Sequence, residues 1–217
     1  MLPTWTLWQL AACAAASVAF VPASCPRERI AFAFALPFLP LGALGFDWTF
    51  ALAGWAARGG HGAAPPFGGV VAYGALFGFV LAFVVGTRVV RTSTTAALER
   101  VALPLALLVA LGRVGCFFAG CEEGIPTSLP WGVLGEHGVR VHPVALYEVA
   151  SALLAGALAT RARRKFLVVC AVYAELRLVI DGLRVHDGVF SPGQWTSLFV
   201  LGLVASALAP RPRLAEN

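Results

Sequence analysis

The stretch LGRVGCFFAGCEEGIPTSLPWGV (residues 111–133) decides how the rest of the sequence is read. It begins as the end of a long apolar run and then places Arg113, two cysteines and two glutamates where the run would continue into lipid. A charged side chain in the middle of a bilayer costs about 2.5–3.5 kcal/mol on insertion scales. Because the chain uses charge sparingly elsewhere, the arginine in this stretch predicts a functional site.

The composition indicates an integral membrane protein. Of the 217 residues, 59% are hydrophobic and 12% are charged, and the mean hydropathy is +0.81. Soluble domains carry about 25% charged residues, and one soluble core cannot bury this much apolar surface. The net charge of +5 is small. It fits loops that face anionic lipid, and with no basic run on a soluble module it predicts no nucleic-acid partner.

Seven apolar segments predict an all-α fold with about seven transmembrane helices in one membrane domain, residues 1–217. Each segment is near the ~20 residues that cross a bilayer, and in lipid the backbone must satisfy its own hydrogen bonds, which favours helices. The second segment contains Pro37 and Pro40, so it forms either two segments or one kinked helix. The predicted segments are residues 5–21, 30–57, 68–86, 96–114, 142–160, 166–183 and 194–209.

The distribution of Lys and Arg predicts the orientation in the membrane. Most of these 16 residues fall in loops on one side, which indicates that the N-terminus lies outside and the C-terminus inside. The longest polar loop, residues 116–141, is then a short extracytoplasmic loop. The first segment has no basic residues before it, so it is interpreted as a span rather than a cleaved signal peptide.

A polar stripe is predicted on the helix YAELRLVIDGLR (residues 173–184). At about 100° per residue, Tyr173, Arg177, Asp181 and Arg184 fall on one face. Two interpretations stay open: a structural ion pair between an arginine and Asp181, or a bound anion. The excess of arginines over carboxylates favours an anion, and the fork of guanidinium donors suits phosphate. In a membrane, the phosphate would be that of a phospholipid head group.

Further polar residues and glycines extend this predicted site. The segment VHPVALYE (residues 141–148) has Pro143 suited to a first helical turn, with His142 before it and Tyr147 and Glu148 after it. His142 is either a helix cap or part of the site. Gly74, with Gly78 four residues later, is either a helix-packing position or part of the same site.

The cysteines at positions 116 and 121 also allow two interpretations. They form a disulfide if the loop faces an oxidising compartment, or they remain two thiols. Their C-x4-C spacing has no second ligand pair, so it does not predict a zinc site. The sequence indicates no cofactor.

Four motifs resemble those of the prolipoprotein diacylglyceryl transferase family. GRVGCFFAGCEEG (residues 112–124) is similar to the family pattern G-R-x-G-N-F-x-N-G-E-x-x-G, and HPVALYE (142–148) is similar to H-P-x-Q-L-Y-E. YAELRLVIDGLR (173–184) is similar to Y-x-x-x-R-x-x-x-E-x-x-R, and SPGQWTSL (191–198) is similar to S-x-G-Q-x-x-S. The motifs follow the family order from about residue 68 to the C-terminus, and four in order are more specific than any one.

The resemblance implies an enzyme of the bacterial inner membrane. Such enzymes transfer the diacylglyceryl group of phosphatidylglycerol to a cysteine thiol of a prolipoprotein and release glycerol 1-phosphate. The implied partners are therefore phosphatidylglycerol, a prolipoprotein and the lipid bilayer. The implied catalytic residues are Arg113, Arg177, His142 and Tyr73. The implied substrate-binding residues are Arg113, Arg177, Arg184, Asp181, Tyr147, Glu148, Tyr173 and Gly74.

The sequence departs from the family pattern at three polar positions. Cys116 replaces the signature asparagine, Cys121 replaces the signature glutamate, and Tyr73 stands where the family has the histidine of a His-Gly-Gly motif. A phenol ordinarily titrates near pH 10, so Tyr73 is a poor base. His142 or Glu148 would then take the thiol proton, or the thiolate would form in solution.

Two alternatives to the transferase remain at this point. A diverged family member would bind phospholipid but have lost the reaction, or would use another acceptor. A transporter or channel is the third interpretation, and the sequence has no internal repeat to support it.

Overall fold

The computed structural model describes residues 4–57, 59–61, 72–121, 123–135, 138–185 and 190–209. Over these residues the chain is almost entirely helical, as predicted. The helices are α1 (Thr4–Phe20), α2 (Pro26–Ala35), α3 (Phe38–Ala57), α4 (Ala72–Val89), α5 (Thr94–Ala119), α6 (Val144–Thr160), α7 (Lys165–Ile180) and α8 (Pro192–Leu208). Two short 3-10 turns, η1 (Val21–Ala23) and η2 (Asp181–Leu183), and two short strands, β1 (Val133–Leu134) and β2 (Arg140–Val141), complete the described elements.

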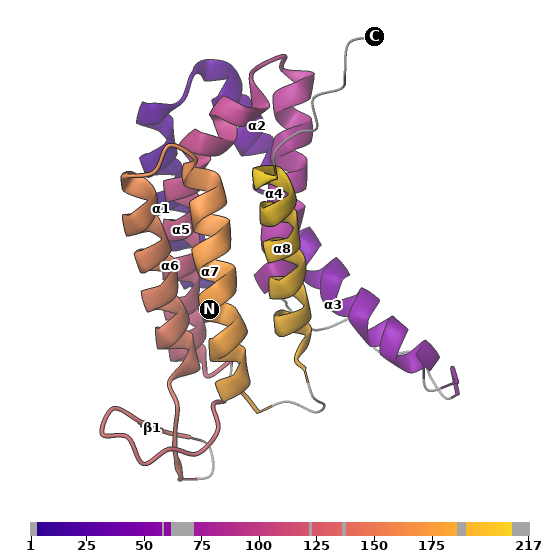
Figure 1. The fold of residues 1–217 in the computed structure, drawn as a ribbon, viewed down its shortest axis with the longest axis vertical. Helices are drawn as coiled ribbons and strands as arrows, with labels where there is room; N and C mark the ends of the chain where they lie inside the picture. Colours follow the sequence, from indigo (N-terminus) through magenta and orange to yellow (C-terminus); the bar gives the residue numbers. More distant parts are fainter. Residues whose placement is uncertain are drawn as a thin grey trace.

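Helix α5 is the centre of the bundle. It packs against α1, α6 and α7, while α8 packs on α7, and α4 contacts α2, α3 and α5. The strands lie beyond one end of the bundle, and α8 ends at the opposite end (Figure 1). Arg113 lies in the last two turns of α5, and the chain leaves that helix toward the strands, so this residue is close to the strand end.

The described residues of the seven predicted segments are largely helical, and residues 68–71 of the third segment lie outside the described residues. Segment 30–57 forms two helices that meet at Leu36 and Pro37, because a proline cannot donate a backbone hydrogen bond and disfavours helix in the residue before it. Pro40 lies in the first turn of α3, where a proline is tolerated. The sequence left two alternatives open, two segments or one kinked helix. The structure shows two helices.

The lengths and composition of the helices are consistent with a multi-pass membrane protein. Large apolar side chains face outward, such as Val18 at 74% and Leu81 at 67% exposed. Three helical stretches are long and apolar enough to cross a membrane, namely Thr6–Ala23, Pro26–Gly45 and Thr94–Ala119. Three shorter apolar helices accompany them, namely Tyr73–Val89, Val144–Thr160 and Pro192–Leu208.

Helices α3 and α4 cross at glycines. A Cβ on Gly78 would collide with the carbonyl oxygen of Phe38 and lie 2.9 Å from the Cα of Gly42, and a Cβ on Gly42 would collide with the carbonyl oxygen of Gly74. The two backbones are therefore in direct contact. Beyond this crossing, α3 leaves the bundle at an angle (Figure 1). The helix-packing interpretation of Gly74 is supported, and its role in substrate binding stays a prediction.

A second polar contact lies near the start of α5. Glu28 is 1% exposed, accepts a hydrogen bond from the backbone N–H of Cys25 at 3.1 Å in the capping box of α2, and forms an ion pair with Arg100 on α5. This pair links α2 to α5. The neighbouring core contains four stacked or edge-packed phenyl rings, those of Phe20, Phe32, Phe79 and Phe83.

The loop after α5 folds into a small paired structure, here called the head (residues 123–135 and 138–143). β1 pairs with β2 in antiparallel register, with Val133 opposite Val141. Pro126 bridges Val141 from the other side, and Gly124 bridges Arg184. The sequence predicted only a polar loop here, because strands of two residues are too short to show an alternating pattern.

We expect Gly78→Ala to destabilise the protein by about 1–3 kcal/mol, because the added methyl group would force α3 away from α4. The measurement is the apparent midpoint of thermal unfolding in detergent.

Gly45→Ala on α3 is the matched control, since nothing lies within 4 Å of a Cβ at that position. Alanine favours helix over glycine by about 1 kcal/mol, so this variant should be neutral or slightly more stable. Equal midpoints for the two variants would contradict the close crossing.

Candidate functional site

Three arginines from two helices and the turn after them meet at one carboxylate. Glu148 on α6 is fully buried and forms ion pairs with Arg113 of α5, Arg177 of α7 and Arg184 after η2. The Nη1 of Arg177 donates to Oε1 of Glu148 at 2.6 Å. The predicted convergence of these arginines is thus seen in the structure. The group of Arg113, Glu148, Arg177, Asp181 and Arg184 is called the arginine cluster below.

Asp181 is the second carboxylate of the arginine cluster. Its Oδ1 lies 2.9 Å from Nε of Arg184 and 3.7 Å from Nη2 of Arg177. Of the two interpretations left open for the polar stripe, the ion pair between Asp181 and an arginine is present, with both arginines taking part. Among the described residues, three guanidinium groups face two carboxylates. Buried charges need such partners, because an isolated charge in a low-dielectric interior is strongly unfavourable.

The start of α8 is docked on Asp181. Ser191 caps the helix by accepting from the backbone N–H of Gln194 at 3.0 Å, and its hydroxyl donates to Oδ2 of Asp181 at 2.6 Å. Gly193 has no room for a side chain, since a Cβ there would collide with the same carboxylate. The SPGQWTSL motif (residues 191–198) resembles a family motif, but none of its residues was predicted to have a role. The capping-box pattern of Ser191 and Gln194 could have predicted the start of a helix at this motif.

Arg184 reaches the cluster by a different route from the one the helical stripe predicted. The helix α7 ends at Ile180 and η2 follows, and Arg184 itself is extended. Its backbone forms an isolated bridge with Gly124 of the head. Gly124 fits there because it lacks a Cβ, which would collide with the carbonyl oxygen of His142. The predicted helical segment to residue 183 therefore ends in a 3-10 turn, and the bridge with the head forms at the next residue, Arg184.

Tyr73 and Tyr173 extend the polar site toward α8. The Nη1 of Arg177 donates to the hydroxyl of Tyr173 at 3.2 Å, and its guanidinium carbon lies 4.7 Å from the centroid of the Tyr73 ring, a cation–π contact. The Tyr73 and Ser197 hydroxyls are 2.7 Å apart. Because the single hydroxyl proton of Ser197 goes to the carbonyl of Gly193 at 2.8 Å, Tyr73 is the donor in that pair.

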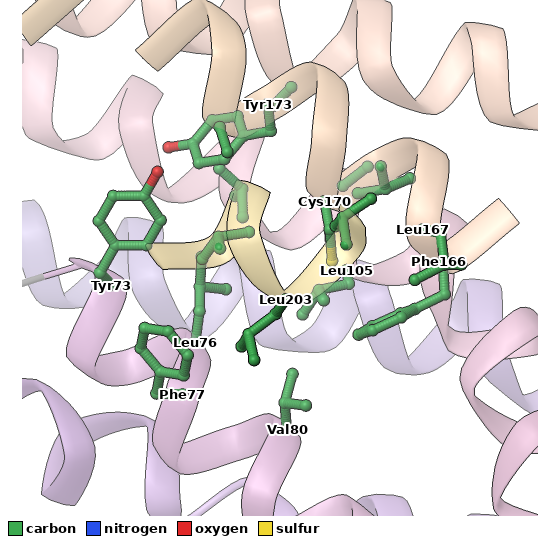
Figure 2. Close-up of a pocket in the computed structure, with 17 residues that line it drawn as sticks. Tyr73, Leu76, Phe77, Val80, Leu105, Phe166, Leu167, Cys170, Tyr173 and Leu203 are labelled. Atoms are coloured by element: carbon green, nitrogen blue, oxygen red, sulfur yellow. The ribbon is translucent and has the colours of Figure 1, made fainter. Parts of the chain in front are cut away.

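An apolar cavity of about 200 Å³ begins at these two tyrosines. Figure 2 shows the two phenol rings at one end, with their hydroxyl groups close to one another, and Phe166 and Leu167 at the other end. Helices α4 to α8 all contribute to its wall. Of the described residues that line it, only Tyr73, Tyr173 and Cys170 carry a polar side-chain atom. The cavity therefore offers an apolar chain a path that ends next to Arg177.

His142 and Tyr147 form a separate group at the edge of the head. The hydroxyl of Tyr147 lies 3.1 Å from Nδ1 of His142 and accepts from Nε1 of Trp131 at 2.8 Å. Among the described residues, no hydrogen bond joins these side chains to the arginines. Trp131 was not predicted to take part, because a tryptophan in a polar loop gives no pattern of its own.

Cys116 and Cys121 lie at the end of α5. Cys116 is half-buried and Cys121 is exposed, and both are thiols. The Nη1 of Arg113 lies 3.9 Å from Sγ of Cys116. Within the part of the chain that the structure describes, no group of three His, Cys, Asp or Glu residues could hold a metal ion.

Comparison with known proteins identifies the family. The family model described as prolipoprotein diacylglyceryl transferase matches residues 59–209, which include every residue of the arginine cluster. The chain belongs to this family. The matched region begins before α4 and ends after α8, so the family relationship covers the cavity as well as the cluster.

Curated relatives agree with the family assignment. The phosphatidylglycerol–prolipoprotein diacylglyceryl transferase of Clostridioides difficile is 29% identical over 150 residues, which are 65% of this chain and 60% of the relative. The protein of the same name from Geobacter sulfurreducens is 31% identical over 166 residues, covering 68% of this chain and 64% of the relative. The match thus spans less than two thirds of the length of either relative.

We expect Glu148→Gln to destabilise the protein by about 3–5 kcal/mol, because it removes the shared partner of the buried Arg113 and Arg177 and of the partly buried Arg184. The measurement is again the unfolding midpoint in detergent. Glu175→Gln is the control, since Glu175 is exposed on α7 and its substitution should change stability by less than about 0.5 kcal/mol. A midpoint for Glu148→Gln equal to that of the control would contradict the central role of Glu148.

Proposed function

We propose that this protein transfers the diacylglyceryl group of phosphatidylglycerol to the cysteine thiol of a prolipoprotein. The thiolate attacks the glycerol carbon that carries the phosphate. A carbon–sulfur bond forms, the carbon–oxygen bond breaks, and glycerol 1-phosphate leaves with the bonding electrons, while a base takes the thiol proton.

One observation carries this proposal: an arginine cluster lies at the end of an apolar cavity in a chain of this family. A phospholipid has the same two parts, a phosphate and apolar chains. Guanidinium groups bind phosphate through paired donors and stabilise the charge that builds on it as the ester bond breaks. The Nε of Arg177 is buried and has no hydrogen-bond partner among the described residues, so it is a donor available to a ligand.

The base is the least defined part of the mechanism. Both side-chain oxygens of Glu148 already form ion pairs with arginines, so this carboxylate is occupied by its structural role. His142 lies at the head, and its ring is held through Nδ1 by Tyr147. We therefore favour His142 over Glu148 as the acceptor of the thiol proton, with Tyr147 and Trp131 orienting its ring.

The proposed location is the bacterial inner membrane, with the head on the extracytoplasmic side. The Lys and Arg distribution supports an outer N-terminus and an inner C-terminus. In that orientation the head faces the compartment from which an exported prolipoprotein would approach. The arginine cluster then lies near the outer membrane surface, within reach of lipid head groups.

We expect Arg113→Ala to lower the transferase rate at least about 100-fold, because removing one charge-stabilising donor costs 10²–10³ in rate. The purified protein would be incubated with phosphatidylglycerol and a lipobox peptide, and diacylglyceryl on the peptide thiol would be followed by mass spectrometry.

Arg163→Ala is the control for charge, since Arg163 is exposed in the loop between α6 and α7 at the other end of the bundle. It should keep the wild-type rate. Near wild-type activity of Arg113→Ala would contradict the phosphate-binding role of this arginine.

A second candidate is a family member that binds phospholipid but has lost the reaction or uses another acceptor. The specific observation in its favour is Tyr73, which stands at the position of the family histidine. Its hydroxyl donates to Ser197 and its ring lies under Arg177. It therefore closes the end of the cavity and offers no basic atom to a thiol.

The variant Tyr73→His separates the two candidates. If the chemistry was lost at this position, histidine should restore transfer to the lipobox peptide in a protein that otherwise only binds phosphatidylglycerol. If the wild-type protein already transfers the group through another base, the variant should change the rate by less than about tenfold, since general bases contribute 10²–10⁴. Tyr73→Phe is the matched control, because it removes only the hydroxyl contact with Ser197.

A further inference from the structure

The end of α5 places two cysteines, Cys116 and Cys121, in one helix-capping motif. Gly120 has a φ of +63°. The N–H of Cys121 donates to the carbonyl of Cys116 at 3.1 Å, and the N–H of Gly120 donates to the carbonyl of Phe117 at 3.3 Å. These two bonds define a Schellman motif, in which the residues at the positions of Cys116 and Cys121 commonly make a side-chain contact.

The backbone of this motif brings the two cysteines within the reach of a disulfide. A carbonyl oxygen lies about 2.4 Å, and an amide nitrogen about 1.5 Å, from the Cα of the same residue. With the 3.1 Å hydrogen bond between them, the two Cα atoms are at most about 7 Å apart. Disulfides usually join Cα atoms roughly 4.4–6.8 Å apart, so the upper bound for this pair lies close to the upper end of that range.

The two thiols differ in access. Cys121 is exposed and Cys116 is half-buried, so an oxidant reaches Cys121 first and Cys116 completes the bond. The other cysteines lie on different elements: Cys13 on α1, Cys25 before α2 and Cys170 on α7. The pair at the end of α5 is therefore local to the head and to the arginine cluster.

Arg113 connects the pair to the arginine cluster. Its Nη1 lies 3.9 Å from Sγ of Cys116 and donates to that sulfur, while its Nε forms an ion pair with Glu148. In the disulfide, the Sγ of Cys116 is bonded to the Sγ of Cys121 and turned toward it. Oxidation of the pair therefore changes the surroundings of an arginine that is buried in the cluster.

We propose that Cys116 and Cys121 form a reversible disulfide site whose state is coupled to Arg113. The thiolate of Cys121 attacks a sulfur of a disulfide oxidant and releases one thiol. The thiolate of Cys116 then attacks the sulfur of Cys121 and releases the second thiol. Two cysteine thiols are oxidised, one oxidant disulfide is reduced to two thiols, and a reducing dithiol reverses both steps.

The test is to equilibrate the full-length protein in detergent with glutathione buffers of defined oxidised-to-reduced ratio. Acid quenching, alkylation and peptide mass spectrometry then measure the fraction of Cys116 joined to Cys121. We expect an intramolecular Cys116–Cys121 peptide that forms reversibly, while Cys13 and Cys170 remain alkylated. Cys121→Ser should abolish it, and mixed glutathione disulfides alone in the wild type would overturn the proposal.

The coupling to Arg113 is measured in the same buffers with Arg113→Lys. In this variant the reduced pair loses the hydrogen bond that Arg113 donates to Cys116, so the disulfide forms more easily. The ratio of oxidised to reduced glutathione at half oxidation should therefore fall about two- to threefold. Arg140→Lys, in the exposed head, is the matched control and should leave the ratio unchanged. An unchanged midpoint in a folded Arg113→Lys protein, or in Arg113→Gln if the lysine variant does not fold, would refute the coupling. No lipid takes part in this measurement, so its result is independent of the transferase reaction.

Discussion

The buried carboxylate of Glu148 is the constraint on which the rest of the site depends. Three guanidinium groups share its two oxygens, and none of the three arginines could be buried at low cost without such a partner. The carboxylate sits at the point where α5, α6 and α7 converge, so the packing of these helices and the pairing of the charges require each other. A helix that shifted by one turn would leave at least one charge without its partner.

The head and α8 complete the same arrangement from outside the three helices. The head holds Arg184 through its backbone bridge to Gly124, and α8 holds Asp181 through the cap at Ser191. Each of these contacts uses a glycine where no side chain fits. The cluster is thus held by the backbone as well as by charge, and the head and the membrane helices behave as one unit around it.

The sequence was sufficient to predict the helices and the convergence of the arginines, while it left the ion pair of Asp181 and a bound anion as alternatives. Those predictions rest on hydrophobic length and on the cost of charge in lipid, which act locally and strongly. The pairing of Arg184 with Gly124, the docking of Ser191 on Asp181 and the contact of Tyr73 with Ser197 were missed. Each joins residues at least ten positions apart, and no periodicity in the chain reports such contacts. The split of residues 30–57 was left open because proline allows either a kink or a break.

The departures from the family pattern lie beside the ion pairs rather than within them. In the sequence motifs that resemble those of the family, Arg113, Glu148, Arg177 and Arg184 coincide with motif residues, and Asp181 stands where the motif has a glutamate. Tyr73 and Cys116, in contrast, only touch the cluster, through a ring face and a sulfur. Replacing a charged member would leave a buried charge without its partner, at a cost of about 3–5 kcal/mol, whereas a neutral residue at the edge alters reactivity with little change in stability. The electrostatics of the site therefore preserve its capacity to bind an anion while leaving the chemistry at its edge open to change.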